Sequence, residues 1–333
     1  MTQSVSIIVP VYNVEKYIER CAVSLFEQTY PNIEYVFVND STLDESMQIL
    51  KRVLLRYPSR QNNTIIVDHE VNRGLAAARN TGLANCKGDF IVHVDSDDYL
   101  EHNAVELLVN KQTITNADIV TGKALRHDFD NDKLIPHPHY RSKNEMVLDM
   151  MQLTINHAIW RRLIRKSLYD DYQIKAEEGV NCGEDCWVMT QLAYYASSVS
   201  FIDEVVYHYD CTRSDSYMSS IKEGLNKKKI KDDIATAKLI IDFFKDKEQI
   251  FYDEANTVAL NYMNNVLFSC ARLKDKPYYY EILSQMKSFD KKYWSIINWD
   301  KFYCRLSVHN FHSCRVFEQM MKLYGQVISK VKS

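Results

Sequence analysis

Acidic side chains gather at two places in this chain, and both could do chemistry on a phosphate-bearing ligand. Asp95-Ser96-Asp97-Asp98 places three carboxylates within four residues, and Gly183-Glu184-Asp185 places two more side by side. Carboxylates crowded in this way repel one another unless a cation neutralises them. Oxygen ligands alone favour a hard ion, Mg²⁺ or Mn²⁺, which usually keeps positions open for substrate phosphates. The first cluster therefore predicts a metal site.

Each cluster also has a purely structural explanation. Ser96 or one of the aspartates could cap a helix that starts near Tyr99, and Glu184 and Asp185 are acids of the kind favoured in a first helical turn. A cap accounts for one aspartate at 95–98 but not for three. For Glu184 and Asp185, the residues alone favour the cap.

The segments around these acids alternate between strand and helix patterns. Short apolar, β-branched runs favour strands, and the amphipathic stretches between them favour helices. The predicted strands are Val5–Val9, Ile33–Val38, Thr64–Val67, Phe90–Val94 and Asp118–Thr121, and the predicted helices are Val14–Gln28, Asp44–Tyr57, Asn72–Asn85 and Ala104–Lys111. This alternation predicts an α/β fold with a mostly parallel, Rossmann-like sheet flanked by helices on both faces.

Polar residues follow three of the predicted strands directly. They are Pro10-Val11-Tyr12-Asn13, Asn39-Asp40-Ser41 and the acidic run 95–98. In doubly wound sheets, ligands bind beyond the carboxyl ends of the strands, where the strand order reverses. An aromatic ring and several acids are therefore expected at one edge of the sheet. The first strand is followed by PVYNVEKY rather than GxGxxG, which argues against a dinucleotide-dependent dehydrogenase.

The chain changes character near residue 220. Long helical segments, Ile221–Lys247 and Asp253–Leu273, replace the alternation, so we expect a catalytic domain at 1–220 and an α-helical extension at 221–333. The tail 301–333 carries six Lys or Arg residues and one acid among many apolar side chains. It could lie on a membrane surface or pack on the body with a basic outer face. Both alternatives, and a homodimer, stay open.

Composition excludes several other classes of protein. A net charge of −3 over 333 residues gives no basic excess, so no nucleic-acid partner is expected. The eight cysteines form no CxxC pair, which disfavours structural zinc and favours free thiols in a reducing compartment. No apolar run reaches the roughly 18 residues of a membrane span. We expect a cytoplasmic location, with peripheral contact at the inner face of the cell membrane left open.

At this point three segments together resemble the family-2 glycosyltransferases with the GT-A fold. They are SVSIIVPVYNVEKYIERCAVSLFEQTYPNIEYVFVNDSTLDES, NRGLAAARNTGLANCKGDFIVHVDSDDYL and the later GEDCW. The resemblance implies an inverting, metal-dependent hexosyltransferase. It would move sugar from a nucleotide-sugar, commonly a UDP-sugar, to a hydroxyl of a saccharide or lipid-linked saccharide, in bacterial cell-surface glycan synthesis. The alternative is a non-catalytic member that binds nucleotide-sugar or scaffolds a glycan assembly complex.

The resemblance implies roles for the residues that follow the first two strands. Tyr12 would stack on the donor base beside the backbone around Pro10, although a core position for this ring is the alternative. Asp40 would accept the N3–H that uracil carries and cytosine lacks. The family usually has two acids followed by Gly here, whereas this chain has Asn39-Asp40-Ser41, which puts the details of the base pocket in doubt.

Further roles concern the acidic run and the helix before it. Asp97 and Asp95 would hold Mn²⁺ or Mg²⁺, with Asp95 also reaching the ribose, and Ser96 would belong to the nucleotide site. Arg79 would reach the nucleotide or the carboxylates, with a structural ion pair as an equal alternative. Asp98 is interpreted as a cap or a support of its neighbours.

The later motifs resemble the catalytic and acceptor side of the family. The resemblance makes Asp185 the catalytic base and gives Glu184 the task of orienting it or the acceptor. Trp160 could form a sugar platform, with core packing equally open. His208 or Arg213 could hold the diphosphate, although each could also be structural.

Overall fold

The computed structural model describes residues 3–138, 140–152, 154–212, 225–290, 292–293 and 311. The chain divides into two compact units, Met1–Ser214 and Asp215–Ser333. The expected boundary near residue 220, Arg213 and the tail 301–333 apart from Phe311 lie outside the described residues.

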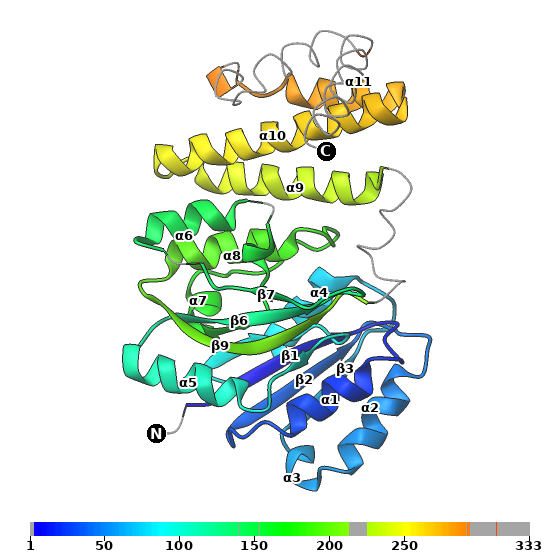
Figure 1. Cartoon of the computed structure of the whole chain (residues 1–333), viewed down its shortest axis with the longest axis vertical. Coiled ribbons are helices and arrows are strands. Elements are labelled where there is room, and N and C mark those ends of the chain that lie inside the picture. The colour runs from blue at the N-terminus through cyan, green and yellow to red at the C-terminus, as the bar shows by residue number, and fades with distance from the viewer. Residues whose placement is uncertain are drawn as a thin grey trace, which may run out of the picture. The chain divides into compact units, whose positions relative to one another are not determined.

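The first unit is built on a nine-stranded mixed sheet (Figure 1). Its strands are β1 (Val5–Val11), β2 (Ile33–Asn39), β3 (Thr64–Asp68), β4 (Phe90–His93), β5 (Tyr99–Leu100), β6 (Ile119–His127), β7 (Lys133–Ile135), β8 (Arg162–Arg165) and β9 (Val199–Asp210). Their order is β3-β2-β1-β4-β8-β6-β9-β5, and β7 pairs with β6. The strands β1 to β4 are parallel, as predicted. Beyond β4, β8 enters antiparallel to both β4 and β6, so the second half mixes directions.

Helices flank this sheet. They are α1 (Ile18–Phe26), α2 (Ser46–Leu55), α3 (Pro58–Gln61), α4 (Leu75–Asn85), α5 (Ala104–Thr115), α6 (Lys143–Met150), the 3₁₀ turn η1 (Ile155–His157), α7 (Lys166–Asp171) and α8 (Glu184–Tyr195). The α/β class with flanking helices is therefore confirmed.

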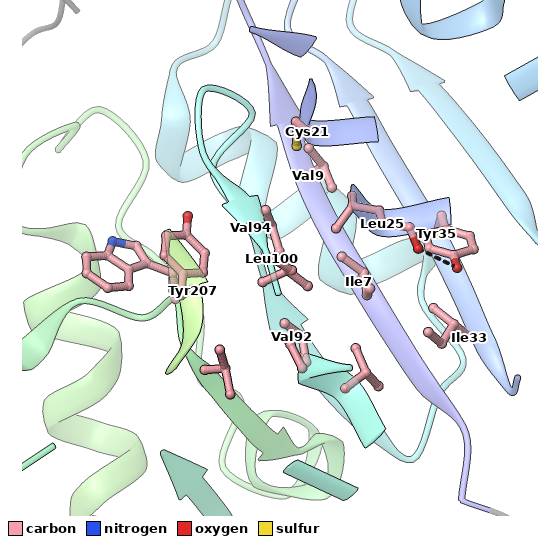
Figure 2. Close-up of a cluster of buried hydrophobic side chains, with 14 of the residues drawn as sticks. Ile7, Val9, Cys21, Leu25, Ile33, Tyr35, Val92, Val94, Leu100 and Tyr207 are labelled. Carbon is pink, nitrogen blue, oxygen red and sulfur yellow. Dashed lines mark hydrogen bonds between the residues drawn. The ribbon is translucent and has the colours of Figure 1, made fainter. Parts of the chain in front are cut away.

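The main core lies between one face of the sheet and helices α1, α2 and α5. Figure 2 shows Ile7 and Val9 of β1 beside Cys21 and Leu25 of α1. The Tyr35 hydroxyl donates to the backbone oxygen of Leu25 at 3.0 Å, so this buried hydroxyl keeps a partner. Alternation along β1 turns its even-numbered side chains to the other face of the sheet.

Helix α4 lies close against β1 on that other face. A Cβ added to Gly82 would stand 2.3 Å from the Ile8 side chain, so only glycine allows this approach. The small residues Ala77 and Ala78 of this helix are also buried. The close packing sets where the next residue, Arg79, can reach.

The second unit is helical in its described part, as predicted for the extension. Its helices are α9 (Lys227–Phe244), α10 (Gln249–Leu273) and α11 (Lys276–Met286), and they share an apolar cluster that includes Leu260, Leu267 and Tyr279. Of the helices that the structure describes, none has both the length and the apolar composition to cross a membrane.

Candidate active site

A buried arginine joins the two acidic clusters. Arg79 on α4 donates from Nη2 to Oδ1 of Asp95 at 2.8 Å and from Nη1 to Oε1 of Glu184. Asp95 lies just beyond β4, and Glu184 is the first residue of α8. The side chains of Arg79 and Glu184 are each 5% exposed. The turn after β4 and the start of α8 therefore meet at one place, although they are far apart in the sequence.

The charges around Arg79 do not cancel. Burial by itself lowers the pKa of Arg79. The negative charges of Asp95, Glu184 and Asp185 have the larger, opposite effect, so the pKa of Arg79 is raised above its ordinary value. Burial raises the pKa of Glu184 to about 8, with Asp185 adding to the rise and Arg79 opposing it. One guanidinium faces three carboxylates here, so the site keeps an excess of negative charge that favours a further cation.

The acidic run 95–98 forms a tight turn after β4, closed by the Asp98 amide donating to the Asp95 carbonyl at 3.0 Å. Asp98 is buried and accepts from the Tyr207 hydroxyl at 2.7 Å and from the Asp210 amide at 2.8 Å. It therefore anchors the end of β9. The helix-cap alternative for this run is wrong, because β5 follows directly and α5 begins only at Ala104.

Asp97 and Asp95 are the candidate ligands for a divalent ion. Both are partly exposed, and burial, together with their carboxylates, raises the pKa of Asp98 well above its ordinary value. Within the described ranges, no group of three or more His, Cys, Asp or Glu side chains is arranged as a ligand set. Mg²⁺ and Mn²⁺ sites often use one or two carboxylates completed by water and substrate phosphates. The donors present therefore fit an ion of this kind.

The ends of β1 and β2 form the side of the site that is expected to bind the nucleotide base. Tyr12 follows β1 directly and is 42% exposed, so it is not a core aromatic. Asp40 follows β2 and is buried. The Asp40 carboxylate accepts from the amides of Arg73 and Gly74 at 2.8 Å each and from Nδ1 of His69 at 2.7 Å. A carboxylate offers about four acceptor positions, which leaves one for an incoming N–H.

Sequence reasoning missed His69. It stands just beyond β3, and its ring links Asp40 to the Thr81 hydroxyl of α4, with Nε2 and Oγ1 2.8 Å apart. The rule applied to the other strands, that polar residues after a strand end form the site, would have found it. Arg20 was also missed: it donates to the carbonyl of Asp97 at 2.9 Å and pairs with Asp210 at 2.6 Å. No local pattern marks that contact.

Asp185 is the second residue of α8, where the positive end of the helix dipole favours a carboxylate. Its Oδ1 accepts from the Cys186 amide at 2.8 Å and lies 3.5 Å from Nε2 of His157. The carboxylate is 19% exposed, in contrast to the buried Glu184 beside it. The two acids of this motif therefore differ: Glu184 pairs with Arg79, and Asp185 remains accessible.

Two further predicted residues, Trp160 and His208, do not join this cluster in the structure. Trp160 is 4% exposed and stacks on Tyr207, with ring centroids 4.6 Å apart, so it is a core residue rather than a sugar platform. His208 has both ring nitrogens engaged, by Glu101 at 2.8 Å and His127 at 2.9 Å, so the structure does not support contact with a diphosphate. Arg213 lies outside the described residues.

A small cleft of about 230 Å³, open solvent included, lies beside Arg79 and reaches Asp185. His93 of β4 lines it, and its Nε2 lies 3.2 Å from the Tyr169 hydroxyl. The Nδ1 of His93 and the Nε of Arg79 are buried without a hydrogen-bond partner among the described residues. Burial, with Arg79 adding to it, lowers the pKa of His93 to about 3.

His93 therefore makes the stability of the first unit pH-dependent. Its folded pKa lies below the unfolded value near 6.5, so its contribution is present above that pH and is lost as the pH falls. Between pH 7 and 5.5 the wild-type protein should lose about 1 kcal/mol of unfolding free energy through this group, and His93→Gln should remove that loss. Urea titrations at the two pH values measure it, with His102→Gln at an exposed histidine as control. An identical pH response in wild type and His93→Gln would contradict the assignment.

The fold is that of the GT-A class. The structure of S. aureus TarS 1–349 in complex with UDP-GlcNAc has the same fold, with a TM-score of 0.71 and 20% sequence identity, covering 96% of this chain and 92% of that chain. A family model described as "Glycosyl transferase family 2" matches residues 6–175, about half of the chain. The chain therefore belongs to glycosyl transferase family 2.

Relatives in bacteria agree with this family. Glycosyltransferase GlyA of Streptococcus pneumoniae is 32% identical over 217 residues, which cover 62% of this chain and 30% of GlyA. The uncharacterized glycosyltransferase EpsJ of Bacillus subtilis is 32% identical over 217 residues, covering 63% of this chain and 61% of EpsJ. The chain thus spans less than two thirds of the length of these relatives.

Proposed function

We propose that the protein is an inverting, metal-dependent glycosyltransferase that moves sugar from a UDP-sugar to a hydroxyl of a saccharide or lipid-linked saccharide in bacterial cell-surface polysaccharide or glycoconjugate synthesis. The observation that carries this proposal is the pairing of Arg79 with both Asp95 and Glu184. This pairing supports a site in which metal ligands and a base act together, as a single displacement requires. The bacterial relatives of the chain support the family.

The donor nucleotide would lie across the ends of β1, β2 and β4. The exposed ring of Tyr12 would stack on the base beside Pro10, which contributes about 1–3 kcal/mol in such contacts. The remaining acceptor position of Asp40 would take the uracil N3–H. Ser96 and Asp95 would lie along the ribose and diphosphate.

A divalent ion held by Asp97 and Asp95 would stabilise the negative charge that develops on the departing diphosphate. Arg79 keeps Asp95 in place at 2.8 Å and supplies positive charge next to it. Asp185 would accept the proton of the acceptor hydroxyl. At the same time the hydroxyl oxygen would bond to the anomeric carbon, and the bond from that carbon to the diphosphate would break. One displacement of this kind inverts the anomeric centre. Glu184, held by Arg79, would fix the start of α8, where the catalytic base Asp185 lies.

The test is a panel of UDP-, GDP- and dTDP-sugars screened for thermal stabilisation with and without Mn²⁺. We expect UDP-sugars to stabilise the wild-type protein only when the ion is present, by about 2.7 kcal/mol at a concentration one hundred times the Kd. Asp97→Ala should lose this metal-dependent gain, because it removes one of the proposed ion ligands.

Asp130→Ala, at an exposed aspartate of the same unit, is the matched control. Equal stabilisation of Asp97→Ala and wild type would contradict the metal assignment. Metal-dependent binding without release of UDP would favour the non-catalytic, scaffolding alternative.

A further inference from the structure

His157 faces the candidate base and was not singled out by its sequence context. It ends the turn η1, and its Nε2 lies 3.5 Å from Oδ1 of Asp185. Its other ring nitrogen, Nδ1, lies 2.8 Å from the backbone oxygen of Gln152. A carbonyl oxygen can only accept a hydrogen bond, so Nδ1 must carry a proton. The ring is thereby oriented with Nε2 toward the carboxylate.

The backbone on both sides of His157 is held by one buried side chain. Arg162 of β8 is 1% exposed, and its guanidinium donates to the carbonyl oxygens of Asn156 and Ala158, the residues immediately before and after His157. The Asn156 side chain also donates to Asp149 of α6 at 3.3 Å. The imidazole therefore approaches Asp185 from a rigid support, since moving it would leave a buried guanidinium without acceptors.

The start of α8, which carries Asp185, is also held in place. The Sγ of Cys186, next to Asp185, donates to the carbonyl of Met150 at 3.3 Å, which joins the start of α8 to the end of α6. Oδ1 of Asp185 accepts a hydrogen bond from the Cys186 amide and is also the oxygen that His157 faces. No described residue forms a hydrogen bond with Oδ2. The charged groups near the pair include Arg162 from β8, Asp149 from α6, Arg79 from α4 and Glu184, the residue before Asp185 on α8.

We propose that His157 is a positioning residue for Asp185, holding Oδ1 so that Oδ2 is presented to the acceptor hydroxyl. This inference rests on the proposed function, in which Asp185 is the base. The pair is attractive only when Nε2 also carries a proton, because a bare Nε2 would turn its lone pair toward the carboxylate. A proton on Nε2 would place an N–H donor 3.5 Å from Oδ1 of Asp185, in a region already crowded with Glu184 and Asp95. In this arrangement the Gln152 carbonyl orients the imidazole, the imidazole orients Asp185, and Asp185 faces the acceptor.

Two amide substitutions separate the two nitrogens of the ring. His157→Asn places an amide N–H near Nδ1 and removes Nε2, and His157→Gln places an amide N–H near Nε2. We expect His157→Asn to lower kcat about 10-fold, a fraction of the 10²–10⁴ that a general base contributes, with the donor KM and the melting temperature close to wild type. His157→Gln should restore part of kcat. UDP release is measured from the donors UDP-GlcNAc and UDP-glucose with Mn²⁺, and His102→Asn is the control.

A measurement that needs no donor accompanies these assays. In ¹⁵N-histidine NMR of the full chain, Asp185→Asn should shift the Nε2 resonance of His157 and leave its Nδ1 resonance in place. A wild-type kcat for His157→Asn, or an Nε2 resonance that ignores Asp185→Asn, would overturn the positioning role. Full turnover in Asp185→Asn would instead overturn the proposed base, so the two failures are distinguishable.

Discussion

Asp185→Asn is expected to abolish transfer while the protein still folds and binds its donor. The amide oxygen can keep the 2.8 Å contact with the Cys186 amide, and the side chain is partly exposed, so the start of α8 should be undisturbed. The amide cannot accept the proton of the attacking hydroxyl. Loss of general-base help lowers kcat by about 10²–10⁴. The rate of UDP release, measured with the UDP-sugar that stabilises the protein most, checks the value.

The matched control for Asp185→Asn is Asp171→Asn, an exposed aspartate in the same unit. Its turnover should equal that of wild type. Donor-dependent thermal stabilisation should be the same in all three proteins, because neither aspartate is placed against the nucleotide. A turnover number for Asp185→Asn within a factor of two of wild type would remove the residue from the reaction.

Arg79→Met is expected to cost the largest amount of stability of any single substitution considered. It leaves Glu184 buried without its cation and next to Asp185 and Asp95. Breaking a buried ion pair by removing one partner typically costs about 3–5 kcal/mol, because the remaining charge is uncompensated. The free energy of unfolding from urea titration measures it at pH 9, one unit above the pKa of Glu184, where this carboxylate is mostly ionised in the wild-type protein.

A double substitution separates the lost pair from lost packing. Arg79→Met combined with Glu184→Gln should be less destabilised than Arg79→Met alone, because the stranded carboxylate is gone. Arg56→Met, which removes an exposed ion pair with Glu19 at 2.8 Å, should change stability by about 1 kcal/mol or less. If Arg79→Met and Arg56→Met lowered the free energy of unfolding by similar amounts, the bridge between the acidic clusters would not be a stabilising contact.

Local patterns in the sequence were sufficient for the first half of the fold. The helix predicted at Val14–Gln28 carries apolar residues at helical spacing, and all of them are buried in α1: Ile18, Cys21, Ala22, Leu25 and Phe26. The strands β1 to β4 begin where predicted, and Asp40 and Asp95 follow strand ends as expected. These features depend on the periods of 3.6 and 2 residues, which are set by backbone geometry within a few residues.

The same patterns could not show the second half of the sheet. Strand β8 enters between β4 and β6, antiparallel to both, and β5 is a two-residue strand held by β9. The two residues of β5 are too few to show a period of two. Trp160 illustrates the consequence, since its burial depends on Tyr207 and Tyr209 of β9, to which it is brought only by pairing within the sheet.

The residue types at the site were therefore readable from the chain, and their partners were not. Sequence alone indicated an acidic turn after a buried strand, a second acidic pair at a helix start and an arginine on a helix of small residues. Only the tertiary structure decided that Arg79 pairs with Glu184 as well as Asp95, and that His157 faces Asp185. The physical reason is distance along the chain: side-chain pairing across many residues follows from how sheets and helices pack, which no local periodicity encodes.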